Sequence, residues 1–394
     1  MNLVFVSSGQ YPNGGASSNR HIAYAKGLSE AGHDITFLLL SRQTFRNSDY
    51  VDEGTKYICT RPEKNNIRQN KLKKFFLLIQ SFKERNKILL KIHQERKIDA
   101  IVLLDTIVWD LIPLIRFAKS NNIKIVHERT EYPFVVGGNG LIMKLNLKIY
   151  LSYVIKRFDG IYVISNALKK YFDQLLNNKI PIEIINMIVD PDRFITEPTD
   201  EISTYKYIAY CGTLNDSKDG VDILIESFGE ALSKKKINSD IKLILVGDCK
   251  VESFQKKLEH IIEEKNCKNN IIFTGKVERL KVPELLNGAD ALALARPDSM
   301  QAEGGFPTKL GEYLATGKPV IITSVGEICN FLKDGENAFV AKPGNVNSFS
   351  EKITQVFADY PKAMEIGKNG EQLVYNEFNY FKQAEKLADF IESL

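Results

Sequence analysis

The residues best suited to chemistry lie in one stretch, residues 301–314, which reads QAEGGFPTKLGEYL. Gly304 and Gly305 allow a tight turn, and Pro307 suits the first turn of a helix. Backbone amides at the start of that helix would point outward at an anion. The pattern therefore predicts a diphosphate site, formed by Gly304, Gly305, Phe306, Pro307, Thr308, Lys309 and Leu310. The alternative is an ordinary surface turn.

Glu312 lies about one turn further into the same predicted helix. Its carboxylate can reach back beside the helix start and accept hydrogen bonds from the two hydroxyls of a ribose. The alternative is a solvated helix residue. Together the loop and Glu312 predict a site for a diphosphate beside a ribose.

A second group of ionisable residues, His127 to Glu131, directly follows the apolar run 123–126. It places an imidazole and three further ionisable groups just past the end of a predicted strand. A lone histidine is more often a satisfied structural residue than a catalytic one, so both interpretations stay open for His127.

Residues 68–97 contain ten Lys and Arg and only two acids, interleaved with Leu, Ile and Phe. A basic amphipathic helix of this kind can lie on anionic lipid headgroups. The alternatives are a packed helix with a solvated basic face and a nucleic-acid surface. We expect no nucleic-acid partner, because no binding motif is present and the second half is acidic. Residues 1–200 carry 29 Lys and Arg against 20 Asp and Glu, whereas residues 201–394 carry 24 against 29.

Two series of alternating strands and helices must position these residues. Apolar runs predict strands at 2–8, 34–40, 100–104, 123–127 and 160–164, then at 207–211, 241–246, 271–273, 289–294 and 319–323. Helices are expected between them, including 19–31, 109–120, 221–232, 253–265 and 308–316. The chain therefore has the pattern of an α/β protein with two Rossmann-like, doubly wound parallel sheets facing a central cleft.

The domain limits follow from a stretch of linker composition at residues 191–204, which contains proline, acids, serine and threonine. We expect a first domain at 1–196 and a second at 205–375. A helix at about 376–394 is expected to pack back on the first domain.

Several classes of protein are excluded by the composition of the 394 residues. No apolar run approaches the ~20 residues that span a bilayer, and the first residues read as a buried strand, which favours a cytoplasmic protein. The five cysteines show no CxxC spacing and are expected to be reduced thiols. No Asp-x-Asp triplet at a strand end, His/Cys cluster or phosphate-binding GxxxxGK[ST] motif occurs, so we expect neither metal nor cofactor. The glycines at 9–15 do not form GxGxxG, which argues against a dehydrogenase.

Residues 304–320 and 212–225 resemble the donor-binding segments of retaining family-4 glycosyltransferases of GT-B fold. Further matches are residues 163–166, 184–190 with Phe194, 275–277 and the loop with Gly14 and Gly15. The resemblance implies a hexosyltransferase that moves a sugar, with retention, from a nucleoside diphosphate to a polysaccharide or lipid-linked acceptor in cell-surface glycan synthesis. It favours UDP over GDP. The second domain would bind the donor and the first the acceptor, at the inner face of the membrane.

The resemblance also implies roles for individual residues. His127 would face the sugar, Lys218 would neutralise the departing diphosphate, and Glu303 would contact the sugar. Donor contacts would come from Gly212, Thr213, Lys218, Gly275, Val277, Arg296, Gly304, Gly305, Phe306, Pro307, Thr308, Lys309, Leu310 and Glu312. Acceptor contacts would come from Gly14, Gly15, Arg20, Glu128 and Glu131. No metal is implied.

Two positions depart from the family pattern. The family commonly has Arg directly after the first glycine of residues 212–225, where this chain has Thr213, and Lys309 or Arg296 could compensate. It also has two glutamates eight positions apart, but Glu303 lies one place early relative to Glu312. The alternatives are therefore a nucleotide-sugar epimerase or phosphorylase of the same fold, or a non-catalytic GT-B scaffold subunit.

Overall fold

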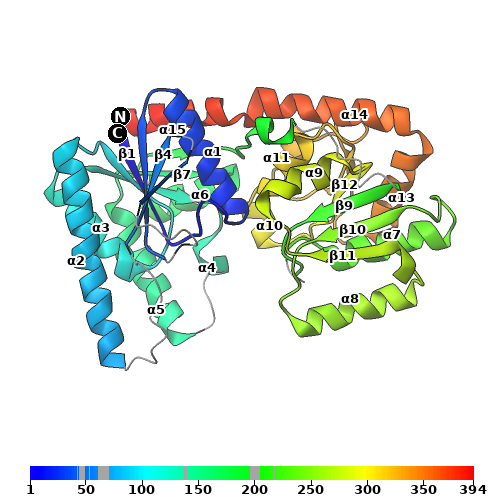
Figure 1. Ribbon diagram of the computed structural model, residues 1–394, viewed down its shortest axis with the longest axis horizontal. Coiled ribbons are helices and arrows are strands. Elements are labelled where there is room, and N and C mark those ends of the chain that lie inside the picture. Colours follow the sequence, from blue (N-terminus) through cyan, green and yellow to red (C-terminus); the bar gives the residue numbers. More distant parts are fainter. Residues whose placement is uncertain are drawn as a thin grey trace. The chain divides into compact units, whose positions relative to one another are not determined.

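The computed structural model describes residues 1–41, 43, 49–52, 54–60, 71–136, 140–195, 205–215 and 218–394, with only the backbone at 49, 71–81 and 136. The chain divides into two compact units. Unit 1 comprises Met1–Asn186 and Tyr380–Leu394, and unit 2 comprises Met187–Asn379. Figure 1 shows that each unit has its own twisted sheet and helices, so each is an α/β unit.

The sheet of unit 1 has the strand order β3-β4-β2-β1-β5-β6-β7-β8. Only the β3–β4 pair among these is antiparallel. The described strands are β1 (Asn2–Ser7), β2 (Asp34–Leu39), β3 (Asp49–Asp52), β4 (Thr55–Cys59), β5 (Ala100–Leu103), β6 (Lys124–Arg129), β7 (Gly160–Val163) and β8 (Ile182–Ile184). β1 and β5 are buried along their whole length, as expected of central strands with helices on both faces.

Helices cover both faces of this sheet, with α1 on one side and α2 and α3 on the other (Figure 1). The helical segments are α1 (Ala16–Glu30), α2 (Lys71–Glu95), α3 (Val108–Ser120), α4 (Pro133–Val136), α5 (Leu141–Ile149), η1 (Tyr150–Val154), η2 (Ile155–Arg157), α6 (Asn166–Leu176) and α15 (Tyr380–Ser393). α15 packs on α1, where Gly27 lets the backbones approach, because a Cβ there would lie 2.6 Å from the Cβ of Ala384.

The sheet of unit 2 is parallel in each pair and has the order β11-β10-β9-β12-β13-β14. Numbered from its first strand the order is 3-2-1-4-5-6, that of Rossmann folds. The strands are β9 (Tyr207–Cys211), β10 (Lys242–Val246), β11 (Ile271–Gly275), β12 (Ala291–Leu294), β13 (Val320–Thr323) and β14 (Phe339–Ala341). The prediction of two doubly wound parallel sheets is confirmed.

The helical segments of unit 2 alternate with these strands. They are η3 (Pro191–Phe194), α7 (Val221–Ser233), α8 (Glu252–Glu264), η4 (Lys268–Asn270), η5 (Arg279–Lys281), α9 (Val282–Asn287), α10 (Met300–Gly304), α11 (Thr308–Leu314), α12 (Ile328–Phe331), α13 (Val346–Ala358), α14 (Tyr360–Leu373) and η6 (Val374–Phe378). α10 is a difference from the sequence prediction, which expected a loop at 301–305. Ser299 explains it, because its hydroxyl accepts a hydrogen bond from the amide of Ala302 and caps the helix.

The boundary between the units lies earlier than the predicted domain end at 196. Residues 187–195 belong to unit 2 because they pack there. The amide of Val189 donates to the carbonyl of Phe378 at 2.9 Å, and Asn287 donates to the carbonyl of Phe194 at 2.8 Å. The predicted linker therefore begins with the ordered turn η3, and its residues 196–204 lie outside the described part. The chain passes between the units a second time, and it returns to unit 1 at Tyr380 rather than at about residue 376 as predicted.

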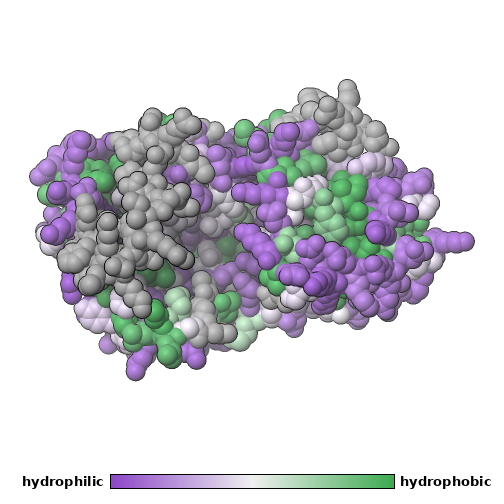
Figure 2. All heavy atoms as spheres, turned by 60° about the horizontal axis from the view of Figure 1, so that its bottom comes forward, coloured by the Kyte–Doolittle hydropathy of each residue, from purple (hydrophilic) through white to green (hydrophobic). Residues whose placement is uncertain are grey.

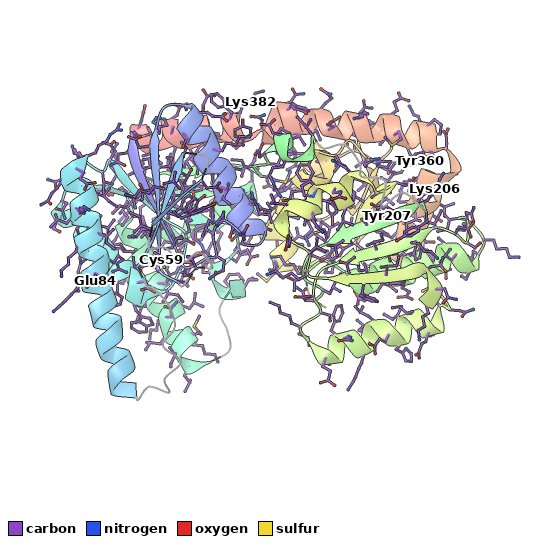
Figure 3. The ribbon with its side chains drawn as sticks, in the orientation of Figure 1. Cys59, Glu84, Lys206, Tyr207, Tyr360 and Lys382 are labelled. Atoms are coloured by element: carbon purple, nitrogen blue, oxygen red, sulfur yellow. The ribbon has the colours of Figure 1, made fainter. Side chains whose placement is uncertain are left out.

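Two further expectations concern composition. In the part of the chain that the structure describes, no helix is long and apolar enough to cross a bilayer. All five cysteines are free thiols. Cys59, labelled in Figure 3, is buried in unit 1, and its thiol contacts the carbonyl of Ser41.

Candidate active site

The topological switch point of unit 2 lies between β9 and β12, from which the chain proceeds to opposite sides of the sheet. Loops after such strands diverge and leave a place for a ligand at the carboxyl ends. Here the two loops touch, because a Cβ on Gly220 would lie 1.9 Å from the carbonyl oxygen of Ala295. The predicted donor residues Gly212, Thr213, Lys218 and Arg296 therefore belong to one edge of the sheet.

Glycines bring the ends of β9, β10 and β11 together at this edge. The amide of Gly212 donates to Val246, and the amide of Gly247 donates to Gly275, each at 2.9 Å. A Cβ on Gly247 would lie 1.9 Å from the carbonyl oxygen of Gly212, so only glycine allows this approach. The predicted donor residues Gly212 and Gly275 therefore both lie next to Gly247 at this edge. Val277, another predicted donor residue, is half-buried and follows the end of β11.

Lys309 provides a cation beside Gly212. Its ammonium lies 2.5 Å from Oδ2 of Asp219 and 3.1 Å from the hydroxyl of Tyr210. A Cβ on Gly212 would lie only 2.1 Å from this Nζ, which places the charge against the glycine loop. Lys309 of α11 therefore places a cation directly beside Gly212.

Asp219 and Tyr210, which sequence reasoning missed, hold that lysine in place. Burial raises the pKa of Asp219, but the ion pair and hydrogen bond with Lys309 outweigh burial, so its pKa is below the ordinary value. The carboxylate therefore stays charged. Arg296 is buried nearby and also lowers this pKa. No sequence motif identifies Asp219. It directly follows the predicted donor residue Lys218 in the same glycine loop.

Thr213 and Lys218 lie on the β9 loop. The side chain of Thr213 is exposed, and its carbonyl oxygen is 3.1 Å from the hydroxyl of Tyr210. The amide of Lys218 donates to the side chain of Asn215 at 3.0 Å.

The 301–310 segment differs from its prediction in detail. Gly304 ends α10, and Gly305 has φ −102°, so neither glycine requires a left-handed conformation. Phe306 is buried against Phe331 and Phe378, which makes it part of the core. Pro307 is buried too and precedes α11 rather than forming its first turn.

Of the first amides of α11, that of Leu310 already donates to the carbonyl of Pro307 at 2.9 Å. Glu303 is exposed on α10 and Glu312 is buried on α11.

Glu312 accepts a hydrogen bond from Nη1 of Arg193 at 2.9 Å, in a largely buried ion pair. Arg193 comes from η3, which has the composition of a linker, and for that reason sequence reasoning missed it. Glu312 also helps to raise the pKa of Cys211, which burial raises to about 12. The carboxylate is therefore close to the end of β9, on the same edge of the sheet as the glycines.

In unit 1, His127 has no exposed surface. Its Nδ1 lies 2.8 Å from the carbonyl oxygen of Leu103, and its Nε2 lies 2.8 Å from the hydroxyl of Tyr150. Its ring stacks on Phe158. Burial lowers the pKa of His127 to about 3, so the imidazole is neutral. This is the geometry of a structural histidine, and its predicted contact with a sugar stays a prediction.

Arg20 and Glu128, predicted to contact the acceptor, are buried and paired with each other at 2.9 Å. His21 lies 2.6 Å from the other carboxylate oxygen of Glu128. Burial raises the pKa of Glu128, but His21 and Arg20 outweigh it and lower the pKa to about 2. These side chains join α1 to β6 and have little surface to offer to an acceptor.

The other residues predicted to contact the acceptor, Gly14, Gly15 and Glu131, are more exposed than Arg20 and Glu128. Gly15 precedes α1, and no atom lies within 4 Å of where its Cβ would be. A Cβ on Gly14 would instead lie 2.0 Å from the hydroxyl oxygen of Ser18. Glu131 is half-buried at the end of β6. Asp105, which sequence reasoning missed, accepts a hydrogen bond from the amide of Ser8 at 2.6 Å. This bond connects the loop after β5 to the loop after β1, and the switch point of unit 1 lies between these two strands.

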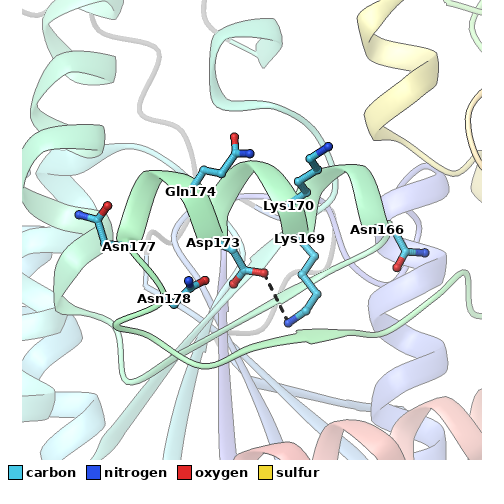
Figure 4. Close-up of a pocket in the computed structure, with 7 residues that line it drawn as sticks. All are labelled: Asn166, Lys169, Lys170, Asp173, Gln174, Asn177 and Asn178. Atoms are coloured by element: carbon cyan, nitrogen blue, oxygen red, sulfur yellow. Dashed lines mark ion pairs between the residues drawn. The ribbon is translucent and has the colours of Figure 1, made fainter.

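A shallow hollow lies elsewhere on unit 1, along α6 (Figure 4). Its lining consists of Asn166, Lys169, Lys170, Asp173, Gln174, Asn177 and Asn178. None of these was predicted as a site residue, and all come from one helix and the turn after it. The described residues also include no group of three or more His, Cys, Asp or Glu that could hold a metal ion.

Residues 192–373 match the model of the family glycosyl transferases group 1. The similarity covers this segment, which is less than half of the chain. It contains the switch point of unit 2, Arg193 and the helices α10 and α11. The group 1 segment therefore includes each predicted donor residue.

Curated relatives extend the match beyond the group 1 segment. An uncharacterized glycosyltransferase of Methanocaldococcus jannaschii is 28% identical over 254 residues, which are 64% of this chain and 64% of the relative. The N-acetyl-alpha-D-glucosaminyl L-malate synthase of Bacillus anthracis is 22% identical over 260 residues, 63% of this chain and 62% of the relative. The chain thus spans less than two thirds of the length of these relatives.

The solved structure of HepE from Anabaena, in complex with UDP and glucose, aligns with 100% of both chains. Its TM-score is 0.72 at 18% sequence identity. This similarity shows the fold, which is GT-B.

Proposed function

We propose that this protein is a retaining hexosyltransferase that takes its sugar from a nucleoside diphosphate, with UDP favoured over GDP. The observation that carries the proposal is the edge of unit 2, where glycine loops, Lys309 and Glu312 meet at a Rossmann switch point inside the group 1 segment. The complex of HepE with UDP and glucose supports the choice of UDP.

In this proposal the cations neutralise the departing diphosphate. Negative charge grows on the phosphates as the bond to the sugar breaks, and positive groups fixed in advance stabilise it. Lys309 is fixed by Asp219 and Tyr210, and Arg296 is buried near the same carboxylate. Lys218, whose amide donates to Asn215, supplies the further charge.

Glu312 binds the ribose in the same proposal. Arg193 donates to Oε1 of its carboxylate at 2.9 Å. The arginine orients the carboxylate. Glu303, exposed on the preceding helix, would contact the sugar.

The proposed acceptor is a polysaccharide or a lipid-linked glycan in cell-surface glycan synthesis, bound by unit 1 at the inner face of the membrane. The stretch 68–97 would provide the membrane contact. In its described part, Arg85 and Leu89 are buried, whereas Lys83, Lys87 and Lys91 are exposed, as in a packed helix with one basic face. Glu84 is exposed on the same helix (Figure 3). Arg68 lies outside the described residues.

Nucleotide binding is the first test. A ligand at ~100 times its dissociation constant stabilises a fold by about 2.7 kcal/mol, so UDP, GDP and ADP can be ranked by thermal shift. UDP is expected to give the largest shift. Absence of any shift would favour the scaffold alternative.

The reaction is tested with UDP-sugars and candidate acceptors. UDP release that requires an acceptor supports transfer, and the anomeric configuration of the product, read by NMR, tests retention. Interconversion of donor sugars without an acceptor would indicate an epimerase, and a requirement for inorganic phosphate would indicate a phosphorylase.

A further inference from the structure

α5 (Leu141–Ile149) exposes large aliphatic side chains. Leu141 is 86% exposed, Ile142 69% and Leu145 50%. Leu141 and Leu145 are four residues apart and share one stripe of the helix, with Ile142 beside it. Figure 2 shows hydrophobic residues gathered at the end of unit 1 where Figure 1 draws α5. Contiguous exposed apolar side chains indicate an interaction surface, whereas scattered ones do not.

α5 is fixed to unit 1 by the buried Asn146. Its side-chain oxygen accepts from the amide of Val108 at 2.9 Å, and its side-chain nitrogen donates to the carbonyl of Thr106 at 3.1 Å. The following segment η1 packs on α3. Asn146 therefore anchors α5 to unit 1, while Leu141, Ile142 and Leu145 are exposed.

Cations accompany the apolar stripe. Lys144 and Lys148, also four residues apart, are exposed on the neighbouring stripe of α5. Lys156 and Arg157 follow in η2, and the sequence has no Asp or Glu between Tyr132 and Asp159. An apolar stripe beside exposed cations matches the surface of a bilayer with anionic headgroups, because the acyl chains are apolar and the phosphates are negatively charged.

We propose that α5 binds the surface of a bilayer containing anionic lipid, with Leu141, Ile142 and Leu145 inserted among the acyl chains and Lys144 and Lys148 at the phosphates. None of these residues belongs to the stretch 68–97. Membrane binding by α5 extends the proposed function, but vesicle binding requires no donor or acceptor, so sugar transfer can stand if this surface fails.

The test is flotation of the full chain with vesicles of phosphatidylcholine, with and without phosphatidylglycerol. Wild type should float with the anionic vesicles and much less with the neutral ones. L141Q/L145Q should lower the partition at least about tenfold, because two inserted leucines are lost. The matched control is L280Q in unit 2, which removes a leucine that is 83% exposed between Arg279 and Lys281 and should bind as wild type does.

K144Q/K148Q gives a second measurement, in case L141Q/L145Q fails to fold by circular dichroism. It should lower binding to anionic vesicles and flatten its dependence on salt. Three outcomes would overturn the proposal: no vesicle binding by wild type, unchanged binding by folded variants of both kinds, or a dimer in size-exclusion chromatography that L141Q/L145Q dissociates without affecting vesicle binding. K71E/K73E/K74E separately tests residues 68–97 and should leave the contribution of α5 in place.

Discussion

Glu312 is the residue whose removal should most directly weaken nucleotide binding. Glu312→Ala removes a charge-assisted acceptor, so the affinity for UDP should fall by about 1–3 kcal/mol, measured by isothermal titration calorimetry. Glu303→Ala is the matched control, because Glu303 is exposed on α10 and is proposed to contact only the sugar. Unchanged UDP affinity in folded Glu312→Ala would remove Glu312 from the site.

Lys218 should act mainly in the transition state. Charge on the diphosphate grows during bond breaking, so Lys218→Ala should lower kcat more than it weakens donor binding. Steady-state kinetics and donor titration measure the two effects, with Lys333→Ala, a substitution of an exposed lysine, as the control. A raised KM with kcat intact would instead assign Lys218 to uniform binding.

His127 should make unit 1 sensitive to mild acid. Its pKa is about 3 in the folded chain against an ordinary 6.5, so the unfolded chain binds more protons between these values. Stability should therefore fall as pH drops below about 6.5, by up to ~1.4 kcal/mol per pH unit for this group. Glu128 adds to the loss only below its ordinary 4.5, because its folded pKa is about 2.

The measurement is urea unfolding between pH 7 and pH 5, followed by fluorescence of the single tryptophan, Trp109, which lies on α3 of unit 1. His127→Gln should flatten the pH dependence, whereas His260→Gln, at an exposed position in unit 2, should not. An equally steep dependence in folded His127→Gln would show that another group is responsible.

Among the elements, the contact of α15 with α1 depends on a single missing methyl group. Gly27→Ala would place a Cβ 2.6 Å from Ala384 and 2.7 Å from the carbonyl oxygen of Tyr380. The helices must separate, which should destabilise unit 1 by about 1–3 kcal/mol.

Urea unfolding followed by Trp109 tests this as well. Gly140→Ala is the control, because no atom lies within 4 Å of the added carbon. Equal stability of the two variants would mean that α15 contributes little to unit 1. Vesicle binding by α5 is likewise a property of a whole helix, since it requires that α5 is intact and fixed by Asn146.

For the whole molecule, we expect sugar transfer without added metal. The proposed neutralising charges are Lys218, Lys309 and Arg296, and the nearby carboxylate of Asp219 is already paired with Lys309. Activity in EDTA should equal activity in magnesium. Loss of activity in EDTA that magnesium or manganese restores would contradict this expectation.

The sequence by itself determined the fold class and most of the strands and loops that hold the predicted donor residues. Apolar runs, glycines and helix starts are local signals, because a strand must be buried and a tight loop must have glycine whatever its neighbours are. The predicted strands therefore agree with β1, β9, β10 and β13 to within a residue or two at each end.

Only the tertiary structure decided which side chains meet. Lys309 and Asp219 are 90 residues apart, and Arg193 and Glu312 are 119 apart. His127 looked available at a strand end, but Leu103 and Tyr150 enclose it. These contacts depend on the strand orders, which place β9 next to β12 and β5 next to β6, and strand order comes from the packing of the whole sheet rather than from any one segment.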